Sequence, residues 1–209
     1  MISKEGIRNV IFDFGGVLFE IDYELPVKAF EKLGFPDFRL FYTQTAQNPM
    51  FDLLETGGVD NDTFLNFLNE LVPHASRKQV LDAWNVILLR IWSSEVEFVH
   101  SLRQSGIRTF LLSNTNAIHV SEFERMIADS MDVELFKAAF EKIYYSNVIG
   151  RKKPHPETFL QLCEWNGLVP SETLFIDDSL QHVEGALKAG LQAYHLKPNE
   201  RVSAVLKSF

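Results

Sequence analysis

The sequence predicts an α/β protein with a doubly wound parallel sheet, a Rossmann-like core, and a helical subdomain inserted after the first strand. Three observations lead to this prediction. A continuous apolar segment, Asn9–Phe14, has the length and composition of a strand buried in a parallel sheet. From about Glu20 to Ile91, helical periodicity dominates. After Trp92, strand-like and helix-like segments alternate, as they do when helices cover both faces of a parallel sheet.

The composition is that of a globular protein. The 209 residues are 46% apolar and 23% charged, and 18 Phe and three Trp can fill a sizeable core. At roughly 100–200 residues per domain, this length allows one domain that contains an insert. The 20 Lys and Arg against 28 Asp and Glu give a net charge of −8. Because no basic run offsets this charge, we expect no nucleic acid and no membrane among the partners.

The sequence indicates neither a targeting segment nor a structural role for cysteine. No apolar segment is long enough to cross a membrane, and the polar start Met1–Arg8 does not resemble a secretory signal. The single Cys163 excludes an internal disulfide framework and a cysteine zinc site. We therefore expect a cytoplasmic protein, either a monomer or a homodimer.

The insert is predicted to be helical throughout. Apolar residues recur at helical spacing in three segments, Pro26–Leu33, Asp62–Val72 and Gln79–Ile91. Glycine and proline, as at Gly57-Gly58, mark the loops between them, and no strand of comparable strength is predicted. We therefore assign residues 20–91 to a helical subdomain, and residues 1–19 and 92–209 to the α/β core.

The elements of the second half follow in order. A capping-box pattern, Ser94-Glu95-Val96-Glu97, predicts a helix that ends at Gly106. The strands and helices expected after it are Ile107–Ser113 (strand), a helix from about Ala117, Lys142–Ser146 (strand), Pro156–Trp165 (helix), Thr173–Ile176 (strand), Leu180–Ala189 (helix) and Leu191–Leu196 (strand).

Chemically reactive side chains follow the predicted strands. They are Asp13 before Gly15-Gly16, Ser113-Asn114-Thr115-Asn116, Lys152-Lys153-Pro154 in a loop after the third strand, and Asp177-Asp178-Ser179. In open parallel sheets, ligands bind beyond the carboxyl ends of the strands. Three carboxylates, a hydroxyl and a lysine are therefore expected to meet at one edge of the sheet.

This set of groups suits phosphoryl transfer. Three neighbouring carboxylates repel one another unless a cation lies among them, and oxygen ligands without a Cys or His cluster suit Mg²⁺. A lysine and a hydroxyl suit the oxygens of a phosphoryl group. An aspartate aligned with that group can act as a nucleophile, while the metal neutralises charge on the transferring group.

The sequence resembles the haloacid dehalogenase-like (HAD) hydrolases over nearly its whole length. Four motifs occur in the family's order: Phe12–Val17, Leu112-Ser113-Asn114, Lys153-Pro154 before a helix, and Phe175–Asp178. The insert resembles the family's helical cap of the first type. The run Ser113–Asn116, together with Gly15, is similar to bacterial α-D-glucose-1-phosphate phosphatases and related sugar-phosphate phosphatases.

The resemblance implies a role for each motif residue. Asp13 would be the nucleophile and would share the ligation of Mg²⁺ with the backbone carbonyl of Gly15. Asp177 would bind the metal directly, and Asp178 would do so directly or through water. The phosphate would be held by Ser113, by the backbone amide of Asn114 and by Lys153, which would also neutralise the nucleophile; Lys152 is expected to be solvated.

One departure from the family bears on activity. Its phosphatases usually carry a general acid and base two residues after the nucleophile, where this chain has Gly15. Such help is worth roughly 10²–10⁴ in rate. Three alternatives stay open: a substrate with a good leaving group, a substitute carboxylate such as Glu20, Asp22 or one from the cap, or a protein that binds its ligand and turns it over weakly or not at all.

The expected function is a Mg²⁺-dependent phosphatase that acts on a small-molecule phosphate ester, such as a sugar phosphate, through an aspartyl-phosphate. A catalytically inactive HAD-like protein that binds a phosphometabolite or a protein is the alternative. Dehalogenation is disfavoured because Asp177 and Asp178 would repel an anionic substrate without a cation, and a phosphomutase would need the missing acid and base. Cap residues 55–57 are candidates to face the site, whereas His119 and His182 are expected at the surface.

Overall fold

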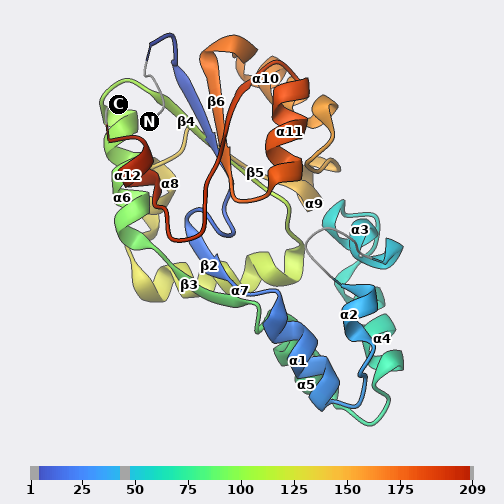
Figure 1. Ribbon diagram of the computed structural model, residues 1–209. Helices are drawn as coiled ribbons and strands as arrows, with labels where there is room; N and C mark the ends of the chain where they lie inside the picture. The colour runs from blue at the N-terminus through green and yellow to red at the C-terminus, as the bar shows by residue number, and fades with distance from the viewer. Residues whose placement is uncertain (1–4, 43–47, 208–209) are drawn as a thin grey trace.

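The computed structural model describes residues 5–42 and 48–207. Its centre is a parallel five-stranded sheet in the order β5-β4-β1-β6-β7 (Figure 1). The strands are β1 (Asn9–Phe12), β4 (Arg108–Ser113), β5 (Lys142–Tyr145), β6 (Thr173–Asp177) and β7 (Gln192–His195). The predicted fold class is therefore confirmed, and the strand order reverses between β1 and β6.

Helices cover both faces of this sheet (Figure 1). The core helices are α6 (Ser93–Gln104), α7 (Ala117–Ser130), α8 (Val133–Ala138), α9 (Ser146–Ile149), α10 (Pro156–Asn166), α11 (Leu180–Lys188) and α12 (Val202–Val205), with a 3₁₀ turn at Pro170–Glu172. Alternate residues of β1 point to opposite faces, so Val10 and Phe12 join one hydrophobic cluster and Ile11 joins the other. Continuous apolar strands are thus buried on both sides, as their composition predicts.

The insert contains five helices within the described residues. They are α1 (Glu24–Lys32), α2 (Phe38–Phe41), α3 (Pro49–Glu55), α4 (Asn61–Leu71) and α5 (Arg77–Asn85). Their apolar faces form a second hydrophobic cluster, which also includes Ile118 of the core helix α7, and aromatic rings such as Phe51 and Trp84 pack against each other within it. This separate cluster supports the proposed division into a cap, residues 20–91, and a core, residues 1–19 and 92–209, parts of which lie outside the described residues.

The prediction of a helix that continues to Ile91 was wrong. Helix α5 ends at Asn85, and β3 (Leu88–Ile91) pairs antiparallel with β2 (Phe19–Ile21). This two-stranded ribbon joins the cap to the core (Figure 1). A short apolar run such as Val86–Ile91 has no periodicity that separates strand from helix. The partner strand, about 70 residues earlier in the chain, decides the matter because it supplies the backbone hydrogen bonds.

The predicted capping box at the start of α6 is also absent. Trp92 is the N-cap residue and makes no side-chain cap, so Ser94 lies inside the helix. The buried Glu95 instead accepts hydrogen bonds from the backbone N and the Oγ of Ser203, both at 2.9 Å. A capping box does form at Ser76–Gln79. Helix α6 therefore begins before Ser94, and Glu95 makes a tertiary contact with α12.

None of the helices in the described part of the chain is long and apolar enough to span a membrane. The other elements expected after Trp92 lie within two residues of their predicted bounds. The short helices α2, α3, α8, α9 and α12 were not predicted, since four to seven residues are too few to show a helical period.

Candidate functional site

The three predicted carboxylates meet at the carboxyl edge of the sheet. Strands β1 and β6 are neighbours, with Phe12 paired to Ile176, so that Asp13 directly adjoins Asp177. One oxygen each from Asp13, Asp177 and Asp178 lies within 4.8 Å of the others. The strand ends therefore bring together residues more than 160 positions apart, as the doubly wound topology predicts.

A buried lysine joins this cluster. Lys153 Nζ lies 2.5 Å from Asp13 Oδ1 and 2.8 Å from Asp177 Oδ2. The Asn114 side chain fixes the lysine's backbone from both sides: its Oδ1 accepts from Lys153 N at 3.0 Å, and its Nδ2 donates to Lys153 O at 2.9 Å. Sequence reasoning gave Asn114 a backbone role only and missed this contribution of its side chain.

The charges of the cluster are not balanced by Lys153 alone. Burial, and then the charge of Asp177, raise the pKa of Asp13 from 3.8 to about 6, although Lys153 opposes them. Burial and the charge of Asp13 raise the pKa of Asp178 to about 7. Burial also disfavours ionised Asp177, but Lys153 and His182 together lower its pKa to about 2. The excess negative charge at Asp13 and Asp178 fits a divalent cation bound between hard oxygen ligands.

The glycines after Asp13 lie in close contact with neighbouring side chains, and the backbone conformation of Gly16 also favours glycine. Gly16 has φ +75°, and a Cβ atom there would overlap the carboxylate of Asp178. A Cβ atom at Gly15 would lie 2.7 Å from Ile21 Cδ1. The loop therefore brings its backbone, rather than side chains, against Asp178 and the ribbon strand β2.

The end of β4 forms a second polar wall. Ser113 is buried at the strand end, next to the end of β1. Thr115 N donates to Ser146 Oγ at 2.9 Å, and that hydroxyl donates to Thr115 O at 3.0 Å. Asn116 Oδ1 caps α7 by accepting from the backbone N of Ile118 and of His119, at 3.1 and 3.0 Å. These bonds hold the loop after β4 in place beside the carboxylates.

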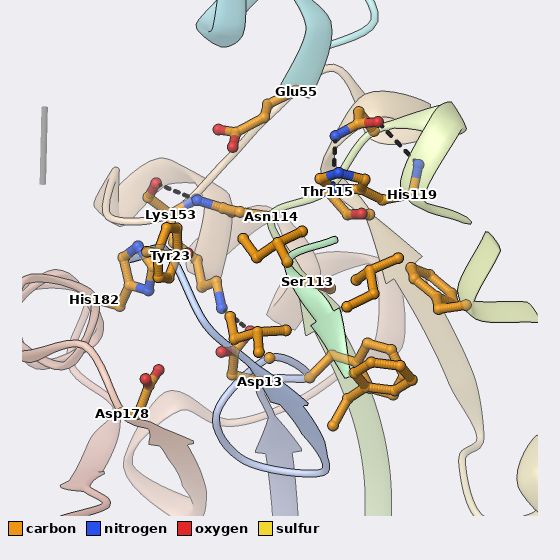
Figure 2. A pocket seen from close by; sticks show the side chains of 18 of the residues that line it. Asp13, Tyr23, Glu55, Ser113, Asn114, Thr115, His119, Lys153, Asp178 and His182 are labelled. Carbon is orange, nitrogen blue, oxygen red and sulfur yellow. Dashed lines mark hydrogen bonds and ion pairs between the residues drawn. The ribbon is translucent and has the colours of Figure 1, made fainter. Parts of the chain in front are cut away.

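A cavity lies between these groups and the cap (Figure 2). It encloses about 80 Å³, several times the roughly 10–15 Å³ that one water molecule needs. Its core side is lined by the groups just described, Asp13, Ser113, Asn114, Lys153 and Asp178 among them, and its cap side by Ile21, Tyr23, Tyr42, Glu55, Ile87 and Leu88. A ligand in this cavity would contact both parts of the protein.

Comparison with known proteins identifies the family. A family model described as a haloacid dehalogenase-like hydrolase matches residues 7–190. The chain belongs to this family. It is 30% identical over 194 residues, 90% of this chain and 91% of the relative, to a D-ribitol-5-phosphate phosphatase of Bacteroides thetaiotaomicron. The specific resemblance to α-D-glucose-1-phosphate phosphatases is not tested by these comparisons and stays a prediction.

Solved structures resemble the chain over almost all of its length. One is a HAD family enzyme of Bacteroides thetaiotaomicron in complex with magnesium and inorganic phosphate, with a TM-score of 0.80 and 31% identity over 95% of this chain and 98% of that one. Another is a HAD-like family hydrolase of Porphyromonas gingivalis, with a TM-score of 0.81 and 30% identity over 97% of each chain.

Two histidines of this HAD-like hydrolase were wrongly predicted at the surface. His119 is buried and stacks on Trp84 at a ring distance of 4.7 Å. Burial lowers its pKa to about 4, so the ring is neutral at pH 7, with Nδ1 3.1 Å from Asn116 Nδ2 and Nε2 3.3 Å from Trp84 O. His182 Nδ1 lies 3.0 Å from Asp177 Oδ2. Both rings line the cavity because each lies in the first turn of a helix that follows a motif strand.

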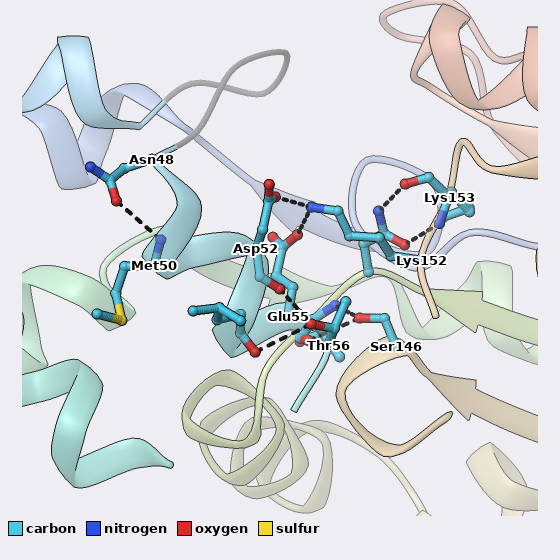
Figure 3. Close-up of polar contacts among 11 residues, drawn as sticks. Asn48, Met50, Asp52, Glu55, Thr56, Ser146, Lys152 and Lys153 are labelled. Carbon is cyan, nitrogen blue, oxygen red and sulfur yellow. Dashed lines mark hydrogen bonds and ion pairs between the residues drawn. The ribbon is translucent and has the colours of Figure 1, made fainter. Parts of the chain in front are cut away.

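Lys152 was expected to be solvated and is not. Its ammonium group is paired with Glu55, at 2.8 Å, and with Asp52, both from helix α3 of the cap (Figure 3). Its side chain is 18% exposed. Glu55 lines the cavity as predicted, whereas Thr56 and Gly57 lie against the core near Gly150 and the Asn147 carbonyl. Lys152 therefore connects the cap to the loop that contains Lys153.

The proposed substitute carboxylates of the ribbon do not reach the cavity. Glu20 Oε2 binds Arg90 Nε at 2.6 Å across the β2–β3 ribbon. Asp22 Oδ1 accepts from Glu24 N at 2.8 Å, at the start of α1. Neither side chain lines the cavity within the described residues. Glu55 is the cap carboxylate that lines it.

Proposed function

We propose that this HAD-like hydrolase is a Mg²⁺-dependent phosphatase of a small sugar phosphate or sugar-alcohol phosphate, and that it acts through an aspartyl-phosphate. The proposal depends on one observation: Asp13 is held by Lys153 within a cluster of three carboxylates at the wall of a cavity between core and cap. The related D-ribitol-5-phosphate phosphatase, and the related structure with magnesium and phosphate, support it.

The metal would be held by Asp13, the Gly15 carbonyl, Asp177 and Asp178. When bound, it supplies positive charge that neutralises the phosphoryl oxygens. Asp178 faces the cavity, while Asp177 is fully buried and accepts hydrogen bonds on both oxygens. Asp177 therefore also fixes the ammonium group of Lys153 beside the nucleophile.

The remaining steps follow from the geometry of the core. Asp13 Oδ attacks phosphorus while Lys153, which retains its charge despite burial because Asp13 and Asp177 raise its pKa, keeps the carboxylate ionised. The Ser113 hydroxyl and the Asn114 backbone amide would bind phosphoryl oxygens at the end of β4. Because cap residues line the cavity opposite the carboxylates, a bound substrate would displace water from between the two parts of the protein.

The leaving-group side of the cavity favours neutral, hydroxyl-bearing alcohols. Among the described lining residues, Lys153 is the single Lys or Arg, and it is bound to Asp13 and Asp177. The cap contributes the Glu55 carboxylate and the hydroxyls of Tyr23 and Tyr42. A leaving group with its own carboxylate would meet Glu55 without a compensating cation, whereas sugar hydroxyls can bind all three.

Phosphate release from a panel of esters tests the proposal. The panel contains D-ribitol 5-phosphate, α-D-glucose 1-phosphate, phosphoglycolate and p-nitrophenyl phosphate, each assayed with Mg²⁺ and with EDTA. We expect turnover with Mg²⁺, a preference for the two sugar-type esters over phosphoglycolate, and no turnover in EDTA. Vigorous turnover in EDTA would contradict the metal assignment.

The intermediate is tested with a ³²P-labelled substrate and acid quench. Protein-bound label that hydroxylamine removes is expected in the unmodified protein and absent in Asp13→Asn. The control is Asp129→Asn, which alters an exposed carboxylate paired with Arg125 on α7. Full activity in Asp13→Asn would refute the nucleophile assignment.

A ligand-binding protein without turnover remains the second candidate, because Gly15 lacks the usual acid and base. It predicts a different outcome from the same panel. No ester would release phosphate, yet one of them, together with Mg²⁺, would raise the melting temperature. That effect would be lost in Lys153→Met, since the lysine would still be needed to bind the phosphoryl group.

A further inference from the structure

The structure raises the question of which group protonates the leaving alcohol. An alkoxide is a strong base and leaves slowly unless it receives a proton as the bond to phosphorus breaks. Gly15 offers no side chain for this purpose, and Glu20 and Asp22 are bound elsewhere. Any donor must therefore come from the cap side of the cavity or from the histidines that line it.

Both histidines in the cavity wall contact neighbouring protein groups through their ring nitrogens. His119 is neutral at pH 7, and both of its nitrogens lie within 3.3 Å of protein partners, the Trp84 carbonyl and the Asn116 amide. His182 directs Nδ1 at the Asp177 carboxylate, at 3.0 and 3.1 Å from its two oxygens. Glu55 is ion-paired with Lys152 at 2.8 Å. His119 is therefore bound at both nitrogens and Glu55 is paired with Lys152, whereas His182 uses Nδ1 in this way and is the donor that competes with the cap phenols.

Tyr23 differs from these groups. It follows the ribbon strand β2, directly precedes α1, and is half-buried on the wall of the cavity that contains Asp13 and Lys153. Its hydroxyl forms no hydrogen bond with any other residue that the structure describes. In Figure 2 the side chain lies between Glu55 and the pair formed by Asp13 and Asp178.

The surroundings keep this hydroxyl protonated. Burial raises the pKa of Tyr23 well above its ordinary value, and the nearby Tyr42, Glu55, Asp178 and Asp13 raise it further. A neutral phenol is therefore present at neutral pH, with a proton to donate. Tyr42 is the other phenol that lines the cavity; it is 4% exposed, and its ring packs within the cap against Phe51 and Trp84, at ring distances of 5.2 and 5.0 Å.

We propose that Tyr23 donates the proton that the leaving alcohol needs, in the role that position 15 cannot fill. This inference rests on the proposed phosphatase function. Asp13 Oδ forms a bond to phosphorus as the bond from phosphorus to the ester oxygen breaks. The electron pair passes to the ester oxygen, which takes the phenolic proton of Tyr23. The phenolate then takes a proton from the water that attacks the aspartyl-phosphate, which restores both Tyr23 and Asp13 and releases phosphate.

The dependence of rate on the leaving group tests this role. Tyr23→Phe is assayed on D-ribitol 5-phosphate, which releases an alkoxide, and on p-nitrophenyl phosphate, whose phenolate leaves without a proton. We expect kcat for the sugar-alcohol ester to fall by roughly 10²-fold more than kcat for the aryl ester. The control Tyr194→Phe removes a hydroxyl that lies outside the cavity, 3.2 Å from Glu200, and should affect neither rate.

Two further variants identify the competing donors. Tyr42→Phe and His182→Gln should lower kcat for the two esters by similar factors, because neither group donates to the leaving oxygen. Equal losses on both esters in Tyr23→Phe, or a selective loss in His182→Gln instead, would overturn the assignment to Tyr23. The proposed function is judged separately by Asp13→Asn, which should abolish turnover of both esters. If the unmodified protein turns over neither ester, both proposals fail.

Discussion

Ile21 occupies the space that a side chain at Gly15 would need: a Cβ atom there would lie 2.7 Å from the δ-methyl group of Ile21. Ile21 belongs to the ribbon that joins cap and core, and it packs against the hydrophobic clusters of both. The absence of an acid–base side chain at position 15 is therefore linked to the packing of the ribbon that joins cap and core.

This contact predicts that restoring an aspartate at position 15 helps little by itself. Gly15→Asp should give a protein with no gain in kcat and reduced stability, because the new side chain must displace Ile21. In an Ile21→Val background, the loss of the δ-methyl group makes room, and Gly15→Asp should then raise kcat for alkyl esters. Steady-state kinetics of the two single variants and the double variant provide the check; a gain in the single variant would contradict the coupling.

The pairing of Lys152 with Glu55 predicts an effect on substrate affinity. Lys152→Gln should remove the ion pairs that restrain the end of α3 and the Glu55 side chain, while Lys153 stays in place. We expect KM for a sugar phosphate to rise roughly two- to fivefold, the factor for about 0.4–1 kcal/mol in a partly exposed ion pair. The rise should be smaller for p-nitrophenyl phosphate, which has no hydroxyls to bind.

Lys78→Gln is the matched control for this prediction. Lys78 is 81% exposed and pairs with Asp82, four residues later on the cap helix α5, at 2.6 Å. Its removal should leave KM unchanged for both esters. Equal KM values in Lys152→Gln and Lys78→Gln would show that the link between Lys152 and the cap does not influence binding.

We expect Gly185→Ala to destabilise the protein, although helix propensity alone favours alanine over glycine. Alanine in place of a helical glycine normally stabilises by roughly 0.5–1 kcal/mol. At Gly185 on α11, however, a Cβ atom would overlap the carbonyl of Pro154, next to Lys153. We expect a loss of roughly 1–3 kcal/mol in urea unfolding, with a lower kcat, whereas the exposed Glu184→Ala should be nearly neutral. Stabilisation by Gly185→Ala would contradict the packing.

The pKa values of the carboxylates predict how Mg²⁺ stabilisation depends on pH. Asp13 and Asp178 have pKa values raised from 3.8 to about 6 and 7, so the folded protein binds protons more tightly than the unfolded chain. Without metal, these two groups therefore lower the free energy of unfolding as pH rises from about 4 to about 7, because the folded protein binds more protons than the unfolded chain over this interval. The lowered pKa of Asp177, about 2, acts oppositely, and its stabilisation is lost only as pH falls below about 4.

Mg²⁺ binds the ionised carboxylates, so its stabilising effect should grow over the same interval. We expect the rise in melting temperature on adding Mg²⁺ to be larger at pH 8 than at pH 5. Differential scanning calorimetry at the two pH values, with Asp178→Asn as the variant that weakens the difference, provides the measurement. An equal shift at both pH values would refute the assignment of Asp13 and Asp178 as ligands.

The buried strands, and the positions of the reactive residues behind them, could be predicted from sequence. Asp13, Ser113 and Asp177 each end or follow a continuous apolar run, and such runs form the interior strands of a parallel sheet. Once the strands are parallel, their carboxyl ends must share one edge. Lys153 could be placed near that edge, but the sequence could not reveal the Asn114 side chain that holds its backbone.

By itself, the sequence determined the fold class and the location of the carboxylate cluster, because both depend on local periodicity and on strand direction. Only the tertiary structure decided the β2–β3 ribbon, the burial of His119, the pairing of Lys152 with Glu55, and the place of Tyr23 in the cavity wall. These features depend on contacts between distant segments, such as the 97 residues that separate Lys152 from Glu55. Local patterns do not encode such contacts, since an exposed loop charge and a buried ion-pair partner look alike in sequence.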